Sequence, residues 1–351
     1  MKILVYGEFY EESFAEHISF SLEKMNYEVF KFPHLSEKVA VKLLGNTALT
    51  KFYYLNKDLL SSNLRIFRKK RLKNLLNHIR DSKPDLIITT YDYLWAEEVE
   101  VIKNTFNLKI VIWSPDSIAS IAAGKSHFLN ASYDALFFKD PYIIKNLSQI
   151  LGLNAFYLPE CFNPHKHVYD KKYNLSEYSC DITTAGNLHS YRVAFFKQLL
   201  DKNYDIKIWG IDSPHWLSAG KVAETFQGRS VYNHEKAAAF LGSKIVVNNL
   251  LLSEIEGVNV RTFEIAGIGG FQLVDWREGI KDLFELENEI DTFKTMDELK
   301  EKIDYYLPRP EERDLIRKNA KKRAIKDHTY ETRLSLLIDT VFNGKKGYIF
   351  Y

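Results

Sequence analysis

The stretches PDLIITT at residues 84–90 and KIVIW at residues 109–113 decide the fold class. Each is a short apolar run that ends in polar turn residues, and similar runs recur between longer stretches of helical periodicity. Parallel strands need long crossover connections, usually helices, so this alternation is typical of β-α-β units. The sequence therefore predicts an α/β protein built on parallel sheets.

The first half of the chain is predicted to contain a helix over Ser13–Met25, because Phe14, Ile18 and Leu22 recur at helical spacing. Residues 35–80 are rich in Leu and Lys and are predicted to be largely helical. In addition to the two runs above, strands are predicted at residues 3–6, 27–32, 134–138 and 155–158.

The segment Pro159–Tyr173 is the predicted domain boundary. It is irregular, carries two Pro and several polar residues, and has no apolar period. A second series of strands and helices follows it. The predicted strands are 181–185, 205–209, 244–247 and 271–274, and the predicted helices are 191–201, 258–267, 296–307, 311–328 and 330–342.

These elements predict two Rossmann-like domains in tandem, residues 1–165 and 174–330, that face a central cleft. A helical tail over residues 331–351 could pack back on the first domain. In open α/β sheets, ligands bind beyond the carboxyl ends of the strands. We therefore expect the functional residues to follow the predicted strands.

Composition excludes several classes of protein. The 351 residues include 48 Lys and Arg against 46 Asp and Glu, and the net charge of +2 gives no overall electrostatic basis for binding nucleic acid. The two cysteines, Cys161 and Cys180, cannot build a disulfide framework or a CxxC metal site. We expect both to be small buried side chains in a reducing compartment.

Hydrophobic patterning gives no sign of a membrane segment. No stretch approaches the roughly 18 uninterrupted apolar residues that a spanning helix needs, and the opening MKILVYGEFY is too short for the apolar part of a signal peptide. The sequence therefore predicts a cytoplasmic protein with no integral membrane segment.

The stretch SEIEGVNVRTFEIAGIGGFQLVD at residues 253–275 carries the clearest chemistry. Glu256 and Glu264 are eight residues apart, and a helix is predicted to begin near Gly257. The amides and positive dipole end of a helix N-terminus suit a phosphate, and Arg261 could add a charge-assisted bond. Carboxylates can accept hydrogen bonds from sugar hydroxyls. The alternative is a surface helix with a capping acid and a small-residue face packed on a strand.

This pattern resembles the donor-site signature of group 1 (family 4-like) glycosyltransferases, and most closely the CgeB-like branch of spore-maturation proteins. The resemblance spans the second half of the chain. Its further motifs are Gly186-Asn187 with Arg192, Ile208 to Gly210, SKIVVN at 243–248, Asn259 to Glu264, and Asp327 to Tyr330 with Arg333. The first half matches more loosely, at Trp113 to Asp116, Lys139-Asp140 and Leu158-Pro159.

The resemblance implies the two-domain type B (GT-B) glycosyltransferase fold, with the nucleotide-sugar donor on the second domain. Glu264 would hold the nucleotide ribose, and Glu256 would lie against the donor sugar. Arg192 and Arg261 would neutralise the leaving diphosphate. The amides of Gly257, Val258 and Asn259 would lie near that diphosphate, and Gly186, Asn187, Gly210 and Asn248 would complete the donor side.

One departure from the family concerns phosphate binding. The lysine that usually follows the first glycine of the loop is missing, and only Arg192 or Lys197 could take its place.

In the first half, Gly7 and Glu8 follow one predicted strand, Asp92 another and Asp116 a third. Because such strand ends face the predicted cleft, we expect Gly7, Glu8 and Asp92 on the acceptor side. Asp116 could orient or deprotonate an acceptor hydroxyl. The alternative is that Asp116 is a loop residue that caps the helix after Ser117.

No metal or separate cofactor is expected. The chain has no Asp-x-Asp motif, which argues against the metal-dependent type A glycosyltransferases. His165 and His167 make a poor zinc site without further ligands. The basic run Arg65–Lys73 (RIFRKKRLK) is predicted to be a solvated helix face, with contact to an anionic acceptor or a membrane surface as the alternative.

The sequence therefore predicts a glycosyltransferase that moves a hexose-like group from a UDP-, GDP- or dTDP-sugar to a hydroxyl of unknown class. The family resemblance implies a retaining reaction, whereas Asp116 could serve as the base of an inverting one. Two alternatives remain open. One is another GT-B nucleotide-sugar enzyme, an epimerase or a phosphorylase, and the other is a non-catalytic module that binds the nucleotide sugar.

Overall fold

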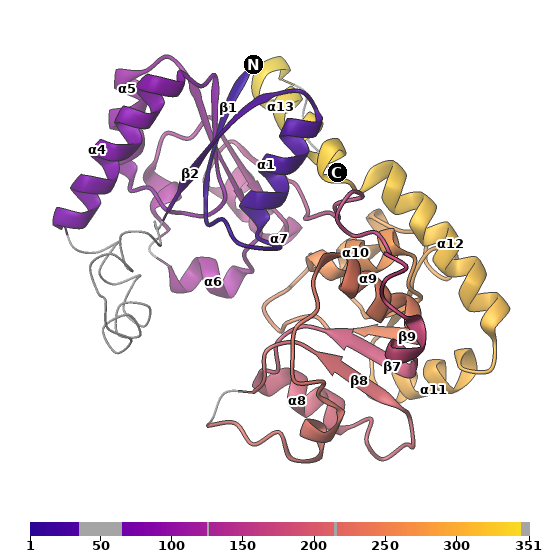
Figure 1. The fold of residues 1–351 in the computed structure, drawn as a ribbon. Coiled ribbons are helices and arrows are strands. Elements are labelled where there is room, and N and C mark those ends of the chain that lie inside the picture. Colours follow the sequence, from indigo (N-terminus) through magenta and orange to yellow (C-terminus); the bar gives the residue numbers. More distant parts are fainter. Residues whose placement is uncertain (35–64, 125, 214–215, 345–351) are drawn as a thin grey trace, which may run out of the picture. The chain divides into compact units, whose positions relative to one another are not determined.

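The computed structural model describes residues 1–34, 65–124, 126–213 and 216–344 (Figure 1). It divides into two compact units, each described by itself below. Unit 1 comprises Met1–Lys139, Ile143–Leu158 and the chain from Leu334 onward, and unit 2 comprises Asp140–Tyr142 and Pro159–Arg333. The predicted helical stretch 35–80 lies partly outside the described residues, and its described part belongs to a helix that begins at Arg65.

Unit 1 is built on a six-stranded sheet in which every pair of neighbouring strands is parallel. Its order is β2-β1-β3-β4-β5-β6. The strands are β1 (Lys2–Gly7), β2 (Glu28–Pro33), β3 (Leu86–Thr89), β4 (Lys109–Ser114), β5 (Ala135–Phe138) and β6 (Ala155–Tyr157). All six were predicted from their apolar runs, and the α/β class is confirmed.

Helices cover both faces of this sheet. Ser13 caps α1 (Phe14–Lys24) by accepting a hydrogen bond from the Glu16 amide, and Ile18 and Leu22 of α1 are fully buried. Helices α4 (Arg65–Ser82) and α5 (Ala96–Thr105) pack against the opposite face (Figure 1). The remaining described helices are α6 (Ile118–Ala123), α7 (Pro141–Lys145), the turns His127–Asn130 and Asn146–Ile150, and α13 (Tyr330–Asn343), whose last part belongs to unit 1.

Unit 2 repeats this topology with a parallel sheet of order β11-β10-β9-β7-β8. Four strands fall where they were predicted, and β11 was not predicted. The strands are β7 (Cys180–Ala185), β8 (Ile206–Trp209), β9 (Ser243–Asn248), β10 (Gln272–Asp275) and β11 (Asp291–Phe293). In unit 1, β1 lies between β2 and β3, and in unit 2, β7 lies between β8 and β9. The strand order therefore reverses beside the first strand of each unit, which gives each sheet a topological switch point there.

Helices also cover both faces of the second sheet. α8 (Ser190–Lys197) and α11 (Met296–Tyr306) contribute to one apolar cluster, while α9 (Asn233–Gly242) and α10 (Val260–Ile268) contribute to another. Helix α9 was not predicted. The unit also holds α12 (Pro310–Asp327) and the helical turns Leu175–Tyr178, Gly220–Thr225 and Glu278–Asp282.

The segment that resembles the closing family motif has a structural role within unit 2. Arg333 is fully buried and donates hydrogen bonds to the carbonyls of Asp327 and Pro159 and to Nδ1 of His328. His328 Nε2 lies 2.8 Å from the Leu283 carbonyl, to which it donates when Nδ1 accepts. Burial, followed by the charge of Arg333, lowers the pKa of His328 to about 3. His328 is therefore a neutral acceptor at pH 7.

The cysteines and the helices agree with two sequence predictions. Cys161 and Cys180 are both buried and unpaired, and burial raises the pKa of the Cys180 thiol to about 12. Among the described helices, none is both long and apolar enough to cross a bilayer.

Candidate functional site

Two arginine side chains converge at the carboxyl end of β7, beside Gly186. A Cβ atom added to Gly186 would collide with Nη1 of Arg192 and Nη1 of Arg261. Arg192 comes from the first turn of α8 and Arg261 from the first turn of α10. Only glycine leaves room for both guanidinium groups at this place.

The backbone around the switch point holds both guanidiniums. Arg192 Nη1 donates to the Asn187 carbonyl at 2.8 Å, and its Nε donates to Oδ1 of Asn249 at 3.0 Å. Arg261 Nη1 donates to the Ala185 carbonyl at 2.6 Å, while its Nε is buried without a hydrogen-bond partner in the described chain. The pair therefore spans the ends of β7 and β9.

The two arginines lack a direct counter-charge. Among the described residues, neither guanidinium has a carboxylate within 4.0 Å. Burial lowers the pKa of both side chains, and the charge of Arg261 lowers that of Arg192 further. The carboxylates of Glu264, Glu254 and Glu160 partly offset the effect of burial on the pKa of Arg261. Because neither guanidinium has a direct ion-pair partner among the described residues, the two neighbouring cations favour binding of an anion such as a phosphate or diphosphate.

Asparagine side chains fix the start of α10. Asn248, fully buried at the end of β9, and Asn259, the N-cap of α10, exchange two amide hydrogen bonds of 3.1 Å. Asn259 Oδ1 also accepts from the Thr262 amide. These contacts anchor the helix N-terminus next to the arginine pair. Gly257 and Val258, just before the helix, are buried.

Glu264 lies in the second turn of α10, and only 3% of it is exposed. Its Oε1 accepts a hydrogen bond of 3.0 Å from Lys236 of α9 and lies 3.5 Å from Nε2 of His167. Its Oε2 is buried and has no hydrogen-bond partner in the described chain. One carboxylate oxygen is thus held in place, and the other remains able to accept a hydrogen bond from a ligand.

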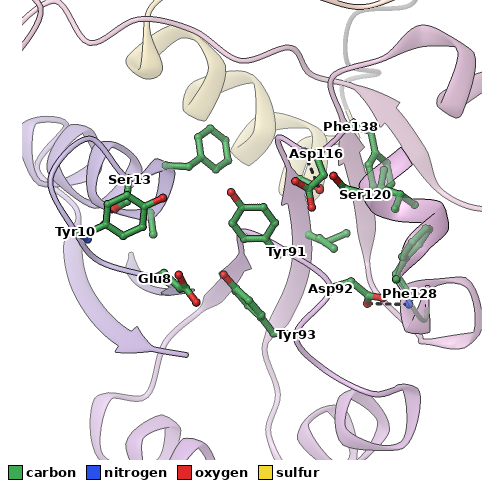
Figure 2. A pocket seen from close by; sticks show the side chains of 16 residues that line it. Glu8, Tyr10, Ser13, Tyr91, Asp92, Tyr93, Asp116, Ser120, Phe128 and Phe138 are labelled. Carbon is green, nitrogen blue, oxygen red and sulfur yellow. Dashed lines mark hydrogen bonds between the residues drawn. The ribbon is translucent and has the colours of Figure 1, made fainter. Parts of the chain in front are cut away.

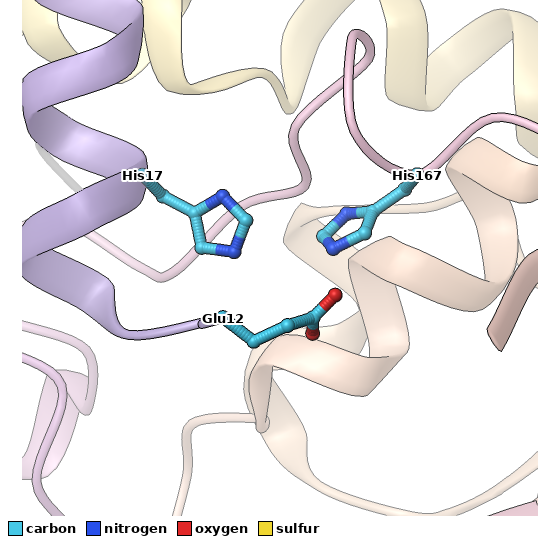
Figure 3. Close-up of side chains that lie close together, drawn as sticks. All are labelled: Glu12, His17 and His167. Atoms are coloured by element: carbon cyan, nitrogen blue, oxygen red, sulfur yellow. The ribbon is translucent and has the colours of Figure 1, made fainter. Parts of the chain in front are cut away.

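The His167 side chain belongs to unit 2 (Figure 3). Within unit 2, the His167 Nδ1 accepts a hydrogen bond from the Asn163 amide at 3.1 Å, so its Nε2 carries the proton. In unit 1, His17 is a buried residue of α1. Lys236, rather than His167, therefore supplies the hydrogen bond that fixes Glu264.

Glu256 lies in the loop before α10, and its backbone is held from two sides. Asp140, which is fully buried, accepts hydrogen bonds from the amides of Ile255 and Glu256. The Glu256 carbonyl accepts from the Gly279 amide at 2.9 Å. The Glu256 side chain is partly exposed. The loop is therefore pinned while its carboxylate stays accessible.

Gly210 and Gly186 allow the backbones at the ends of β8 and β7 to approach each other closely. A Cβ on Gly210 would collide with the Gly186 carbonyl, and the Gly186 amide donates to the Trp209 carbonyl at 2.6 Å. Asn187 Oδ1 accepts from the Ile211 amide at 3.3 Å. These three residues shape the loop around the arginine pair.

The structure distinguishes the two candidates for the missing loop lysine. Lys197 is exposed at the last turn of α8, whereas Arg192 lies in the first turn beside Gly186. Sequence reasoning did not single out His189, the N-cap of α8. Burial, together with the charges of Arg192 and Arg261, lowers the pKa of His189 to about 4, so it is neutral at pH 7.

Unit 1 contains a cavity of about 410 Å³ at the carboxyl ends of β1, β3 and β4 (Figure 2). Glu8, Asp92 and Asp116, which sequence reasoning selected, all line it. The other lining residues are Tyr10, Ser13, Phe14, Ala15, Tyr91, Tyr93, Ile112, Ser114, Ser120, Ile121, Gly124, Phe128 and Phe138. Gly7 does not line it; a Cβ there would lie 2.5 Å from the Cβ of Ala15, so close packing requires glycine.

The carboxylates of this cavity have different surroundings. Asp92 accepts hydrogen bonds from the amides of His127, at 2.6 Å, and Phe128, at 3.0 Å (Figure 2). Burial raises the pKa of Asp92 to about 6, although these amides oppose the shift. The Asp116 amide donates to Ser114 Oγ, and the N-cap of α6 is Ser117 rather than Asp116.

The basic run on α4 is only partly a solvated face. Lys69, Lys70 and Lys73 are exposed as predicted. For Arg68 and Arg71 the prediction is wrong: Arg68 lies 3.9 Å from the ring centroid of Trp95 and pairs with Glu97, and Arg71 pairs with the buried Glu98 at 3.1 Å. These two side chains bind α4 to the neighbouring α5 because buried carboxylates require partners.

Solved structures that are similar over nearly the whole chain decide the fold family. A glycosyltransferase from Rickettsia africae aligns with a TM-score of 0.67 over 97% of this chain and 98% of its own, at 11% identity. The fold is the GT-B glycosyltransferase fold. HepE from Anabaena in complex with UDP-glucose and sucrose-phosphate synthase from Thermosynechococcus elongatus each align at a TM-score of 0.63 and 12% identity, over 98% of this chain and 100% of theirs.

Sequence comparison supports the same relationship for the second half of this GT-B chain. Residues 192–339 match the family model described as glycosyl transferase-like. That range begins at Arg192 and includes α10 with Arg261 and Glu264. Curated protein sequences gave no match. Membership of the CgeB-like branch stays a prediction.

Proposed function

We propose that this protein is a glycosyltransferase that moves a sugar from a nucleoside-diphosphate sugar to a hydroxyl acceptor. The observation that carries the proposal is the pair of guanidiniums of Arg192 and Arg261, which lies at the switch point of the second sheet without a direct ion-pair partner among the described residues. A diphosphate would place negative charge in direct contact with both guanidiniums. The fold agrees with this chemistry, since HepE of the same fold was solved in complex with UDP-glucose.

The donor would occupy the carboxyl edge of the second sheet. Its diphosphate would lie between the arginines and the N-terminus of α10, near the amides of Gly257 to Asn259. The ribose hydroxyls would donate to Oε2 of Glu264, the oxygen without a partner. The sugar would lie against Glu256, whose loop Asp140 holds.

The reaction breaks the bond between the sugar C1 and the diphosphate oxygen and forms a bond from C1 to the acceptor oxygen. Negative charge grows on the departing diphosphate, and two prearranged guanidiniums stabilise it without reorganisation. In the retaining course that we propose, the acceptor oxygen attacks C1 from the face that the diphosphate leaves and gives its proton to the departing phosphate oxygen, so no protein nucleophile is needed. In the inverting alternative, Asp116 would take that proton.

We propose further that the enzyme is metal-independent. The arginine pair brings two positive charges to the diphosphate, which is the charge that a divalent cation supplies in other phosphate sites. Addition of EDTA should therefore leave transfer unchanged, and full loss of activity that Mg²⁺ restores would contradict this part of the proposal.

A thermal-shift panel tests the nucleotide site. UDP, GDP, dTDP, ADP and CMP are compared at equal millimolar concentration, with UDP expected to stand out because of the HepE complexes. A ligand at about a hundred times its Kd adds about 2.7 kcal/mol, equivalent to a shift of roughly 2–4 °C or more. Arg261→Gln should reduce the shift by about half or more, because a tenfold weaker Kd leaves about 1.4 kcal/mol, and Lys197→Gln, at the exposed end of α8, should retain it in full. No shift with any diphosphate would contradict the proposal.

A further inference from the structure

The cavity of unit 1 has the position and size of a small-molecule site. It lies at the switch point beside β1, where ligands of open parallel sheets bind. Its volume of about 410 Å³ falls in the range of about 300–1,000 Å³ typical of such sites. All of its lining residues belong to unit 1.

The charges of its lining select against anions. Glu8, Asp92 and Asp116 bring three carboxylates to the cavity, and no Lys, Arg or His is among the described residues that line it. A phosphorylated or carboxylated ligand would meet like charges and no cation from the described lining residues, which disfavours binding. Carboxylates instead accept strong hydrogen bonds from hydroxyl groups.

Aromatic rings form much of the remaining surface. Tyr91 and Tyr93 follow β3 with ring centroids 5.5 Å apart, and Figure 2 shows the Tyr93 hydroxyl pointing toward Glu8. Tyr93 is also stacked on His34 at 3.9 Å, so its ring is fixed before any ligand arrives. A rigid aromatic ring beside carboxylates offers an apolar face and polar groups together, as a sugar ring requires.

We propose that this cavity binds one uncharged sugar residue of the acceptor. The ring would pack against Tyr91 and Tyr93, and its hydroxyls would donate to Glu8 and Asp116. The identification of this sugar as part of the acceptor rests on the proposed function. The acceptor class is then a neutral glycan or glycoside, and phosphorylated sugars and anionic lipids are excluded from this cavity.

The test uses the full chain and saturation-transfer NMR with methyl glycosides of glucose, galactose, mannose and N-acetylglucosamine. Glucose 6-phosphate, methyl glucuronide and glucosamine serve as charged comparators. At least one neutral glycoside should bind, and the two anions should not. Preference for an anion, preference for the amine, or no binding of any neutral sugar would overturn the proposal.

Variants then locate the site. Glu8→Gln should weaken binding of the selected glycoside about tenfold, since hydrogen bonds to charged groups contribute that much. Tyr91→Ala should weaken it as well, whereas Glu97→Gln, an exposed carboxylate of α5, should not. Unchanged affinity in Glu8→Gln and Tyr91→Ala would place the glycoside elsewhere. UDP binding of the wild-type chain, measured in the same samples, reports the donor site separately, so failure of one proposal is distinguishable from failure of the other.

Discussion

Both units place charged side chains at the switch point beside the first strand of their sheet, but the charges have opposite sign. Unit 2 presents the guanidiniums of the buried Arg192 and the partly buried Arg261 beside its first strand, whereas unit 1 presents three carboxylates among tyrosines and phenylalanines. The sheets alone therefore do not specify a ligand; the side chains after each strand do. We propose that the cationic site binds the anionic donor and that the acidic, aromatic cavity binds a neutral acceptor.

The largest effect is expected from the cationic site. Arg261→Gln should lower kcat/KM for sugar transfer by about 10²–10³-fold, because a prearranged donor to a developing negative charge contributes that much. The measurement is UDP release in the presence of acceptor. Lys197→Gln, which changes an exposed cation of α8, is the matched control. Equal activity of the two variants would remove the arginine pair from the mechanism.

A loss of about 10-fold to 100-fold in kcat is expected for Asp140→Asn. The buried carboxylate holds the amides of Ile255 and Glu256, and a misplacement of about 1 Å near the reacting centre can cost up to 10²-fold. Because the arginines remain in place, the affinity for UDP should not change. Asp282→Asn, at an exposed position of the same unit, should be neutral. A fall in UDP affinity equal to the fall in kcat would instead indicate a general loss of structure.

The role of Glu264 predicts discrimination at the ribose. UDP should bind wild-type protein about tenfold more tightly than its 2′,3′-dideoxy analogue, since a buried carboxylate oxygen would lose its hydrogen-bond donor. In Glu264→Gln this preference should shrink, and competition titrations measure it. If both proteins distinguish the two nucleotides equally well, the ribose lies elsewhere.

The smallest effect concerns pH. The pKa of His189 is about 4 in the free protein, because burial and two arginines disfavour the imidazolium. A bound diphosphate adds negative charge nearby and raises that pKa, so proton uptake accompanies binding and UDP affinity should rise as the pH falls from 7 toward 5. His189→Asn retains an N-cap acceptor but not the titration, and should bind with a flatter pH profile. UDP itself titrates near pH 6, so the informative quantity is the difference between the two proteins.

The strands of both sheets could be predicted because buried parallel strands are continuous apolar runs with polar ends. Asp116, which follows a predicted strand, was selected for the same reason, whereas Arg192 was selected from the family resemblance. Helix α9, which carries Lys236, was not predicted from the sequence. Its buried residues form one continuous Ala-rich run, so they show no helical alternation of apolar and polar residues. Asn249 and Asp140 act through contacts with residues 57 and 115 positions away, which sequence spacing does not reveal.

The basic run of α4 shows a different limit of sequence reasoning. A charged helix face resembles a solvated one, and only the structure shows that Glu98 is buried beneath it and binds Arg71. Long arginine side chains can cover apolar surface and reach an inner carboxylate at the same time. Charge runs therefore predict exposure only where no buried acid lies on the neighbouring helix.

The most direct test of the central claim is a thermodynamic cycle by titration calorimetry, in which UDP and uridine bind to wild-type protein and to Arg261→Gln. The cycle isolates the interaction between the diphosphate and this guanidinium. We expect the preference of the wild-type protein for UDP over uridine to fall by at least about tenfold in the variant, or about 1.4 kcal/mol. An unchanged preference would show that the arginine pair of unit 2 does not hold the diphosphate.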